Sequence, residues 1–234
     1  MSSVSVSDVT PLRIVLLGKS ISENSRVGNF ILGRAAFDSE APPGIIERLR
    51  GRLKDKHVII INSPQLLQTN IPDDQITQTV RECVFLSDPG PHAFIVILQY
   101  NDFTEEDMRR VKSVLKEFCD EAIKRTIVIT SDEETHDTDK LIKQLNSECG
   151  GGHLQLDHKN EEWCSVVLQR LEDILRENSE EYIACEPYCD TEGSSVDEDW
   201  SRSFTSLRTE EEDSDTSTKK KEAKGFLHNI SKIS

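Results

Sequence analysis

The sequence predicts an α/β fold in which helices cover both faces of a mostly parallel, doubly wound sheet. Short apolar runs rich in β-branched residues recur along the chain, and they are nearly continuous instead of alternating with polar residues. Such runs are typical of parallel strands buried on both faces. Between them, apolar residues recur at helical spacing, and this alternation of strand and helix is the pattern of an α/β sheet.

Five apolar runs are predicted to be strands. In chain order they are Leu12–Leu17, His57–Ile61, Ala93–Leu98, Thr126–Thr130 and the more weakly marked His153–Leu156. We find no internal repeat, so the pattern indicates one sheet and not an array of repeated units.

Three helices are predicted from apolar spacing and from end signals. The segment Thr104–Asp107 resembles a capping box and precedes apolar residues at helical spacing up to Phe118. A second helix is expected over 137–148, where glycines follow as a stop signal. A third is expected over Glu161–Glu177, with Asn160 as its cap.

Charge divides the chain of 234 residues, whose formal net charge is -15. Residues 1–179 carry a net charge of -8, and residues 180–218 carry 13 acids and two bases, whereas residues 219–234 carry five lysines and one glutamate. A long acidic, Ser/Thr-rich run buries too little apolar surface to offset its ordering entropy. We therefore predict a flexible N-terminus over 1–10, a folded domain over 11–178, and a disordered acidic tail over 179–234.

Composition also restricts the classes of partner. The acidic balance disfavours nucleic acid, because phosphate neutralisation needs a basic face, and no apolar run approaches the ~20 residues of a membrane span. The first ten residues lack the features of a signal peptide, so we expect a cytoplasmic protein with reduced cysteines. The basic end, 219–234, is interpreted either as an amphipathic helix that contacts a membrane or a partner, or as an untethered terminus.

A degenerate phosphate loop follows the first predicted strand. Such a loop reads Gly, four residues, Gly-Lys, then Ser or Thr, and here only the first and last positions match. The candidate nucleotide-contacting residues are Gly18, Lys19, Ser20, Ile21, Ser22, Glu23, Asn24 and Ser25.

The substitutions in this loop weaken phosphate binding. Asn24 stands where a lysine would reach the phosphates, and Glu23 places a carboxylate where attraction is needed. At ~4 Å and an effective dielectric near 20, one misplaced unit charge is worth roughly 4 kcal/mol before screening. Lys19 is interpreted either as a solvent-facing loop residue or as a replacement for the missing lysine.

The segments Leu12–Lys19, Val27–Phe37 and Leu86–Gln99, followed by Phe103–Asp107, resemble the GTPases of immunity-associated proteins (the GIMAP family). Residues 148–153 resemble a further segment of that family. The resemblance spans residues 12–175 and implies a P-loop NTPase-like G domain of the AIG type, with GTP or GDP as its ligand.

The resemblance also places further nucleotide-site positions. The family's Asp-Thr-Pro-Gly segment corresponds to residues 62–65, where Asn62 replaces the magnesium-shell aspartate and Gln65 replaces the glycine at the γ-phosphate. Either Asp132 or Glu133 is placed to pair with guanine, and Asp157 stands in a pair associated with base contacts. The interval that carries the family's switch threonine, 38–56, has no threonine.

Phosphate, metal and water-positioning positions are therefore altered together. We expect a degenerate family member with no catalytic residues, no metal site, and weak or absent binding of GTP or GDP. The favoured hypothesis is a non-hydrolysing interaction module that forms homo- or hetero-oligomers with related G-domain proteins, through residues near 65–86. The alternatives are an unconventional GTPase that uses Lys19 and a membrane-surface adaptor that works through the basic tail.

Overall fold

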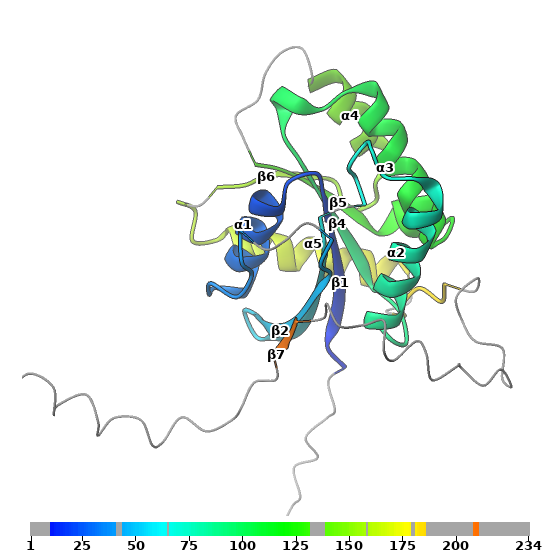
Figure 1. The fold of residues 1–234 in the computed structure, drawn as a ribbon. Helices are drawn as coiled ribbons and strands as arrows, with labels where there is room; N and C mark the ends of the chain where they lie inside the picture. Colours follow the sequence, from blue (N-terminus) through cyan, green and yellow to red (C-terminus); the bar gives the residue numbers. More distant parts are fainter. Residues whose placement is uncertain are drawn as a thin grey trace, which may run out of the picture.

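A twisted, mostly parallel sheet forms the centre of the protein (Figure 1). The computed structural model describes residues 10–40, 44–64, 66–131, 139–157, 159–178, 181–185 and 208–210. In these residues the strand order is β6-β5-β4-β1-β3-β2-β7, and β2 runs antiparallel to β3 whereas the other pairs are parallel. The strands are β1 (Leu12–Gly18), β2 (Glu47–Leu53), β3 (Lys56–Ser63), β4 (Ala93–Leu98), β5 (Thr126–Thr130), β6 (His153–Gln155) and β7 (Arg208–Glu210).

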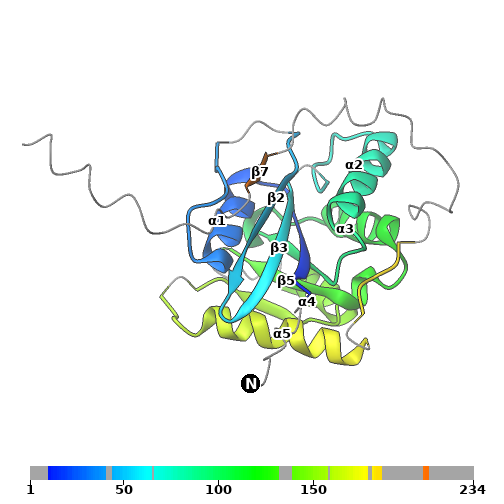
Figure 2. The ribbon, with the colours of Figure 1, turned by 90° about the horizontal axis from the view of Figure 1, so that it is seen from below.

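Helices cover both faces of this sheet (Figures 1 and 2). One face packs on α1 and α5, and the other packs on α2, α3 and α4, so the molecule has two apolar cores separated by the sheet. The helices are α1 (Ile21–Leu32), α2 (Asp73–Leu86), α3 (Glu105–Phe118), α4 (Asp139–Glu148) and α5 (Trp163–Glu177), with short 3-10 turns η1 (Tyr100–Asp102) and η2 (Ala122–Arg125). The predicted α/β, doubly wound fold class is confirmed.

The five predicted strands all form, and β4 and β5 have the predicted bounds. The additional strand β2 was not predicted, because its sequence carries arginine at every second position. Exposed or half-buried arginines alternate there with buried residues, so the strand has only one apolar face.

The predicted helix ends differ in accuracy. At α3 both halves of the capping box form between Thr104 and Asp107, as predicted. At α5 the helix begins at Trp163, and Asn160 instead accepts a hydrogen bond from the backbone N–H of Glu162 at 2.9 Å. Asn160 therefore closes the preceding turn and does not cap the helix.

The folded unit extends past the predicted boundary at residue 178. The backbone N–H of Ile183 donates to the carbonyl of Pro91 at 2.8 Å, and Ile183 and Cys185 are buried. The buried side chains of Ile183 and Cys185 help to hold residues 181–185 on the core. Residues 208–210, also assigned to the tail, form β7. The rest of the predicted tail, its basic end and residues 1–9 lie outside the described residues.

Candidate functional site

The candidate site lies at the carboxyl end of β1, where the strand order of the sheet reverses. β1 pairs with β3 on one side and β4 on the other, and α1 follows it directly. Ligands of doubly wound sheets bind in the crevice outside the carboxyl ends of the strands at such a switch point. The chain segment between β1 and α1 is therefore where a phosphate loop would lie.

That loop is replaced by the first turns of a helix. α1 begins at Ile21, three residues after Gly18, so Glu23, Asn24 and Ser25 are helical. Ser20 is the N-cap, and its hydroxyl accepts a hydrogen bond from the backbone N–H of Glu23. A phosphate loop cradles its ligand with successive backbone N–H groups, and a helix that starts this early leaves a much shorter loop.

Sequence reasoning missed this early helix start, although a signal for it was present. Ser20-Ile21-Ser22-Glu23 has the spacing of a capping box, in which Ser caps a helix and Glu stands three residues later. We interpreted Glu23 only as a lost glycine of the phosphate loop. As a residue of the first helical turn, it is instead compatible with the helix dipole.

Asn24 fills the space beside the end of β1. Its side chain is fully buried, and a Cβ atom built on Gly18 would stand 1.9 Å from its Oδ1 atom. Its Nδ2 atom donates a hydrogen bond to Oδ1 of Asn62 at 3.0 Å. The position that carries a phosphate-binding lysine in a phosphate loop therefore points into the protein.

The same polar contact chain continues into β2. Asn62 lies near the end of β3, and its Nδ2 atom is 3.5 Å from Oε2 of the buried Glu47. Glu47 is a residue that sequence reasoning missed, although it is in phase with the inward-facing Leu49 of β2. The three side chains tie α1, β3 and β2 together where the family resemblance predicts phosphate and magnesium.

Ser25 is also engaged within the protein. Its hydroxyl donates to the backbone carbonyl of Asp38 at 3.1 Å, and the side chain is buried. This contact holds the segment after α1 against the helix. The hydroxyl is therefore not presented to a metal ion beside a phosphate.

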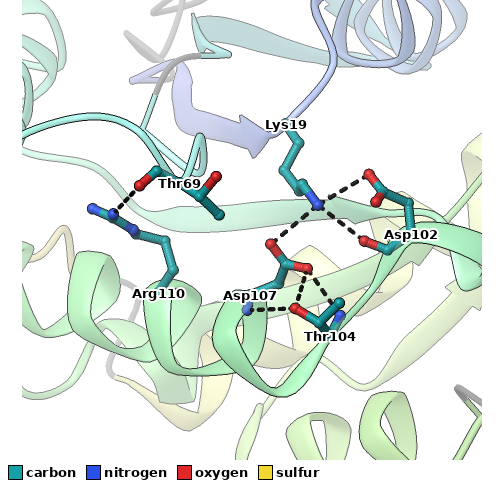
Figure 3. A network of polar contacts seen from close by, with 6 residues as sticks. All are labelled: Lys19, Thr69, Asp102, Thr104, Asp107 and Arg110. Atoms are coloured by element: carbon teal, nitrogen blue, oxygen red, sulfur yellow. Dashed lines mark hydrogen bonds and ion pairs between the residues drawn. The ribbon is translucent and has the colours of Figure 1, made fainter.

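Lys19 is held by two acids on the opposite side of the crevice (Figure 3). Its Nζ atom lies 3.0 Å from Oδ2 and 2.9 Å from the carbonyl oxygen of Asp102, and 3.1 Å from Oδ1 of Asp107. Burial acts to lower the pKa of the Lys19 ammonium, but the hydrogen bonds to both carboxylates outweigh it and raise that pKa. Neither interpretation of Lys19 from the sequence anticipated this network.

The partner acid Asp107 is itself fixed. Its Oδ2 atom accepts hydrogen bonds from the backbone N–H and the hydroxyl of Thr104, at 2.9 and 2.7 Å. The carboxylate thus caps α3 with one oxygen and holds Lys19 with the other, and its side chain is only 4% exposed. A phosphate that recruited Lys19 would have to break this arrangement.

Glu23 is neutralised by a residue that sequence reasoning did not consider. The guanidinium of Arg26 donates to Oε2 of Glu23 at 2.6 Å and to the carbonyl of Ser131, at the end of β5, at 2.8 Å. The repulsion that we assigned to a free Glu23 carboxylate is therefore partly offset. Arg26 instead spans the crevice from α1 to the end of β5.

The remaining predicted nucleotide-site positions add no contact to this crevice in the described part of the chain. Asp157 is exposed, and its Oδ1 atom accepts a hydrogen bond from the backbone N–H of Lys159 at 2.9 Å, within its own loop. Gln65, Asp132 and Glu133 lie outside the described residues. The side chains at this crevice therefore do not fit a triphosphate, because they bind one another where the phosphates would lie.

The chain has detectable relatives in several organisms. The model of the AIG1 family matches residues 12–196. The chain is 26% identical over 177 residues to "GTPase IMAP family member 8" of Homo sapiens, and 25% identical over 195 residues to "Immune-associated nucleotide-binding protein 10" of Arabidopsis thaliana. The matches cover 70% and 75% of this chain but only 27% and 42% of the two relatives, so the chain spans well under half of their length.

Solved structures support the fold alone. A dimerization-deficient mutant of Toc33 from Arabidopsis thaliana aligns with a TM-score of 0.55 at 14% identity, over 73% of this chain and 86% of that one. A chloroplast translocon component, for which dimerization is described as important for GTPase activity, aligns with a TM-score of 0.54. Its alignment covers 71% of this chain and 84% of that one, again at 14% identity.

Within the part of the chain that the structure describes, no helix is both long and apolar enough to cross a membrane.

Proposed function

Because the chain belongs to the AIG1 family, whose model matches residues 12–196, we propose that it is a G-domain protein that does not hydrolyse GTP and that acts as an interaction module. The family implies GTP or GDP as the ligand of the fold. The finer inference, that this member binds nucleotide weakly or not at all and without magnesium, comes from the contacts at the end of β1.

One observation carries the proposal. Asn24 occupies the space next to Gly18 and is hydrogen-bonded to Asn62 inside the protein. Phosphoryl transfer depends almost entirely on positioning and on electrostatic stabilisation of the phosphates. A site that is filled by two neutral amides supplies neither.

The position of Lys19 supports the same inference. A lysine that replaced the lost one would need a free ammonium, whereas Lys19 lies between Asp102 and Asp107. Releasing it would leave the Asp107 carboxylate nearly buried without its cation, which is costly. The unconventional GTPase that uses Lys19 is therefore the less favoured function.

We further propose that this chain assembles in the cytoplasm with itself or with related G-domain proteins. Two structural neighbours are described in terms of dimerization, and this property is carried over here only as a proposal. The surface that we infer includes α2, on which Phe85 exposes 65% of its surface. In such an assembly this chain would contribute a surface, and a relative would contribute the nucleotide.

The experiment measures phosphate release by the full chain, by its Lys19→Ala variant, and by a nucleotide-competent family member with and without the full chain. We expect no release above the blank from the full chain alone. We also expect the full chain to form a complex with the relative in analytical ultracentrifugation. Release by the full chain that disappears in Lys19→Ala would instead establish the enzyme and overturn the proposal.

A further inference from the structure

The strand β2 carries a row of cationic side chains at the side of the sheet. Arg48, Arg50 and Arg52, here called the arginine row, alternate with inward-facing Leu49, Gly51 and Leu53. Successive side chains of a strand point to opposite faces, so the three guanidinium groups share one face. Arg50 and Arg52 are exposed, and Arg48 is half-buried.

The arginine row has no acidic partner among the described residues. Arg48 donates to the carbonyl of Leu86 at 2.9 Å and Arg52 to the carbonyl of Asp55 at 3.3 Å, so both of these hydrogen bonds end on neutral backbone groups. Burial, and then the neighbouring charge of Arg50, lower the pKa of Arg48. In a chain with a net charge of -15, these three cations, which have no carboxylate partner in the described ranges, concentrate positive charge on one strand.

The backbone of the chain's own tail lies along β2. β7 pairs in parallel with β2 in the register Glu47↔Arg208, Arg48↔Thr209 and Leu49↔Glu210. The sequence continues after Glu210 as Glu211-Glu212-Asp213-Ser214-Asp215. An acidic segment therefore follows directly from the point where the tail pairs with the arginine-bearing strand.

We propose that β2 is a docking site for this acidic segment, and that the register of β7 continues to residue 213. That register sets Glu211 opposite Arg50 and Asp213 opposite Arg52. Residues opposite each other in a sheet share a face, and opposite charges at such positions stabilise the pairing. Glu210 and Glu212 fall on the other face.

The chain is long enough for this docking to occur within one molecule. Twenty-two residues separate Cys185, which is buried in the core, from Arg208. An extended segment of that length spans roughly 70–80 Å, which exceeds the width of a domain of this size. The tail can therefore reach β2 without strain.

The docked segment protects a vulnerable part of the sheet. An uncovered edge strand exposes unpaired N–H and C=O groups that invite pairing with another chain. Docking of the acidic tail covers the edge of β2 and neutralises the arginine row in one step. Edge pairing of β2 with a second copy then competes with the chain's own tail.

Hydrogen exchange of the β2 amides in the full chain tests the proposal. The paired variants are Glu211→Arg/Asp213→Arg and the control Glu210→Arg/Glu212→Arg, which changes the net charge equally but on the other face. We expect the first pair to accelerate exchange over residues 47–53 by about tenfold, the combined worth of two exposed ion pairs. We expect the control variant to change the exchange rate far less. Equal effects of the two double variants would overturn the proposed register of residues 211–213 on β2.

A rescue and a backbone variant complete the test. Arg50→Glu/Arg52→Glu should accelerate exchange alone and restore protection when combined with Glu211→Arg/Asp213→Arg. The triple change of Arg208, Thr209 and Glu210 to Pro removes the tail's donors and should release β2, whereas the triple change to Ala should not. Identical exchange rates in the proline and alanine variants would overturn docking within the chain. Protection of the β2 amides that rises with protein concentration would also overturn it, because it would mean that β2 pairs with a second copy.

Discussion

Replacing Asn24 with alanine perturbs the contact on which the closed phosphate site depends. The side chain is fully buried and donates to Oδ1 of Asn62 at 3.0 Å. Its removal leaves that acceptor buried without its donor and opens a space beside Gly18. An orphaned buried acceptor costs about 1–3 kcal/mol. Part of this cost is returned, because the variant also removes the buried Oδ1 atom of Asn24, which has no hydrogen-bond partner, and because alanine has a helix propensity better by at most about 0.7 kcal/mol.

We therefore expect Asn24→Ala to lower the free energy of unfolding of the full chain by about 1–2 kcal/mol. For a domain of this size that corresponds to a fall in Tm of about 2–8 °C. Urea denaturation followed by circular dichroism measures the change directly. The matched control is Ser22→Ala on the exposed side of the same helix, which should stay within about 0.5 kcal/mol of the parent.

A double-mutant cycle separates the Asn24–Asn62 contact from the other contacts of Asn62. The bond from Asn62 to Glu47 is lost in both variants that change Asn62, so the cycle subtracts it. We expect a coupling free energy of about 1 kcal/mol between Asn24→Ala and Asn62→Ala. Additive effects, together with an Asn24→Ala variant as stable as Ser22→Ala, would refute the internal closure of the site.

Three further outcomes follow from the same structure. Lys19→Ala should cost about 1–2 kcal/mol of stability at pH 7, since it leaves a nearly buried carboxylate without its cation. Because the pKa of Lys19 is raised above 10.5, this contribution is fully present below pH 10.5 and is lost as pH rises through the raised value, which a series of urea denaturations from pH 7 upward would show. Burial, followed by two neighbouring arginines, lowers the pKa of His92 from 6.5 to about 4. Its contribution of about 3 kcal/mol is therefore present above pH 6.5 and lost as pH falls toward 4. His92→Asn, whose amide oxygen can accept the same backbone hydrogen bond, should flatten that fall in urea titrations. Gly90→Ala should destabilise the protein by about 2 kcal/mol or more. Gly90 has φ +152°, and a Cβ atom there would lie 2.2 Å from the carbonyl oxygen of Ile183. Limited proteolysis should then cleave the variant near residue 183 sooner than the parent.

Local sequence signals were sufficient for much of the fold. β4 and β5 are continuous apolar runs with abrupt polar ends, so their bounds could be predicted from the sequence alone. The capping box of Thr104 and Asp107 likewise located the start of α3. In each case the deciding interactions are close in sequence, or the strand is buried on both faces.

The candidate site could be predicted only in part. The loss of lysine and glycine at Asn24 and Glu23 is visible in the sequence, and so is the Ser20–Glu23 spacing that starts the helix early. The contact of Asn24 with Asn62 spans 38 positions, and that of Lys19 with Asp102 spans 83. Such contacts depend on the register and order of the strands, which no local pattern specifies.

Titration calorimetry of the full chain with GTP and with GDP, each with and without Mg²⁺, measures nucleotide binding directly. A site filled by its own side chains predicts no submicromolar binding of either nucleotide, and no gain in affinity when Mg²⁺ is added. Submicromolar GTP binding that requires Mg²⁺ would contradict the closed site and, with it, the proposed role as a non-hydrolysing interaction module.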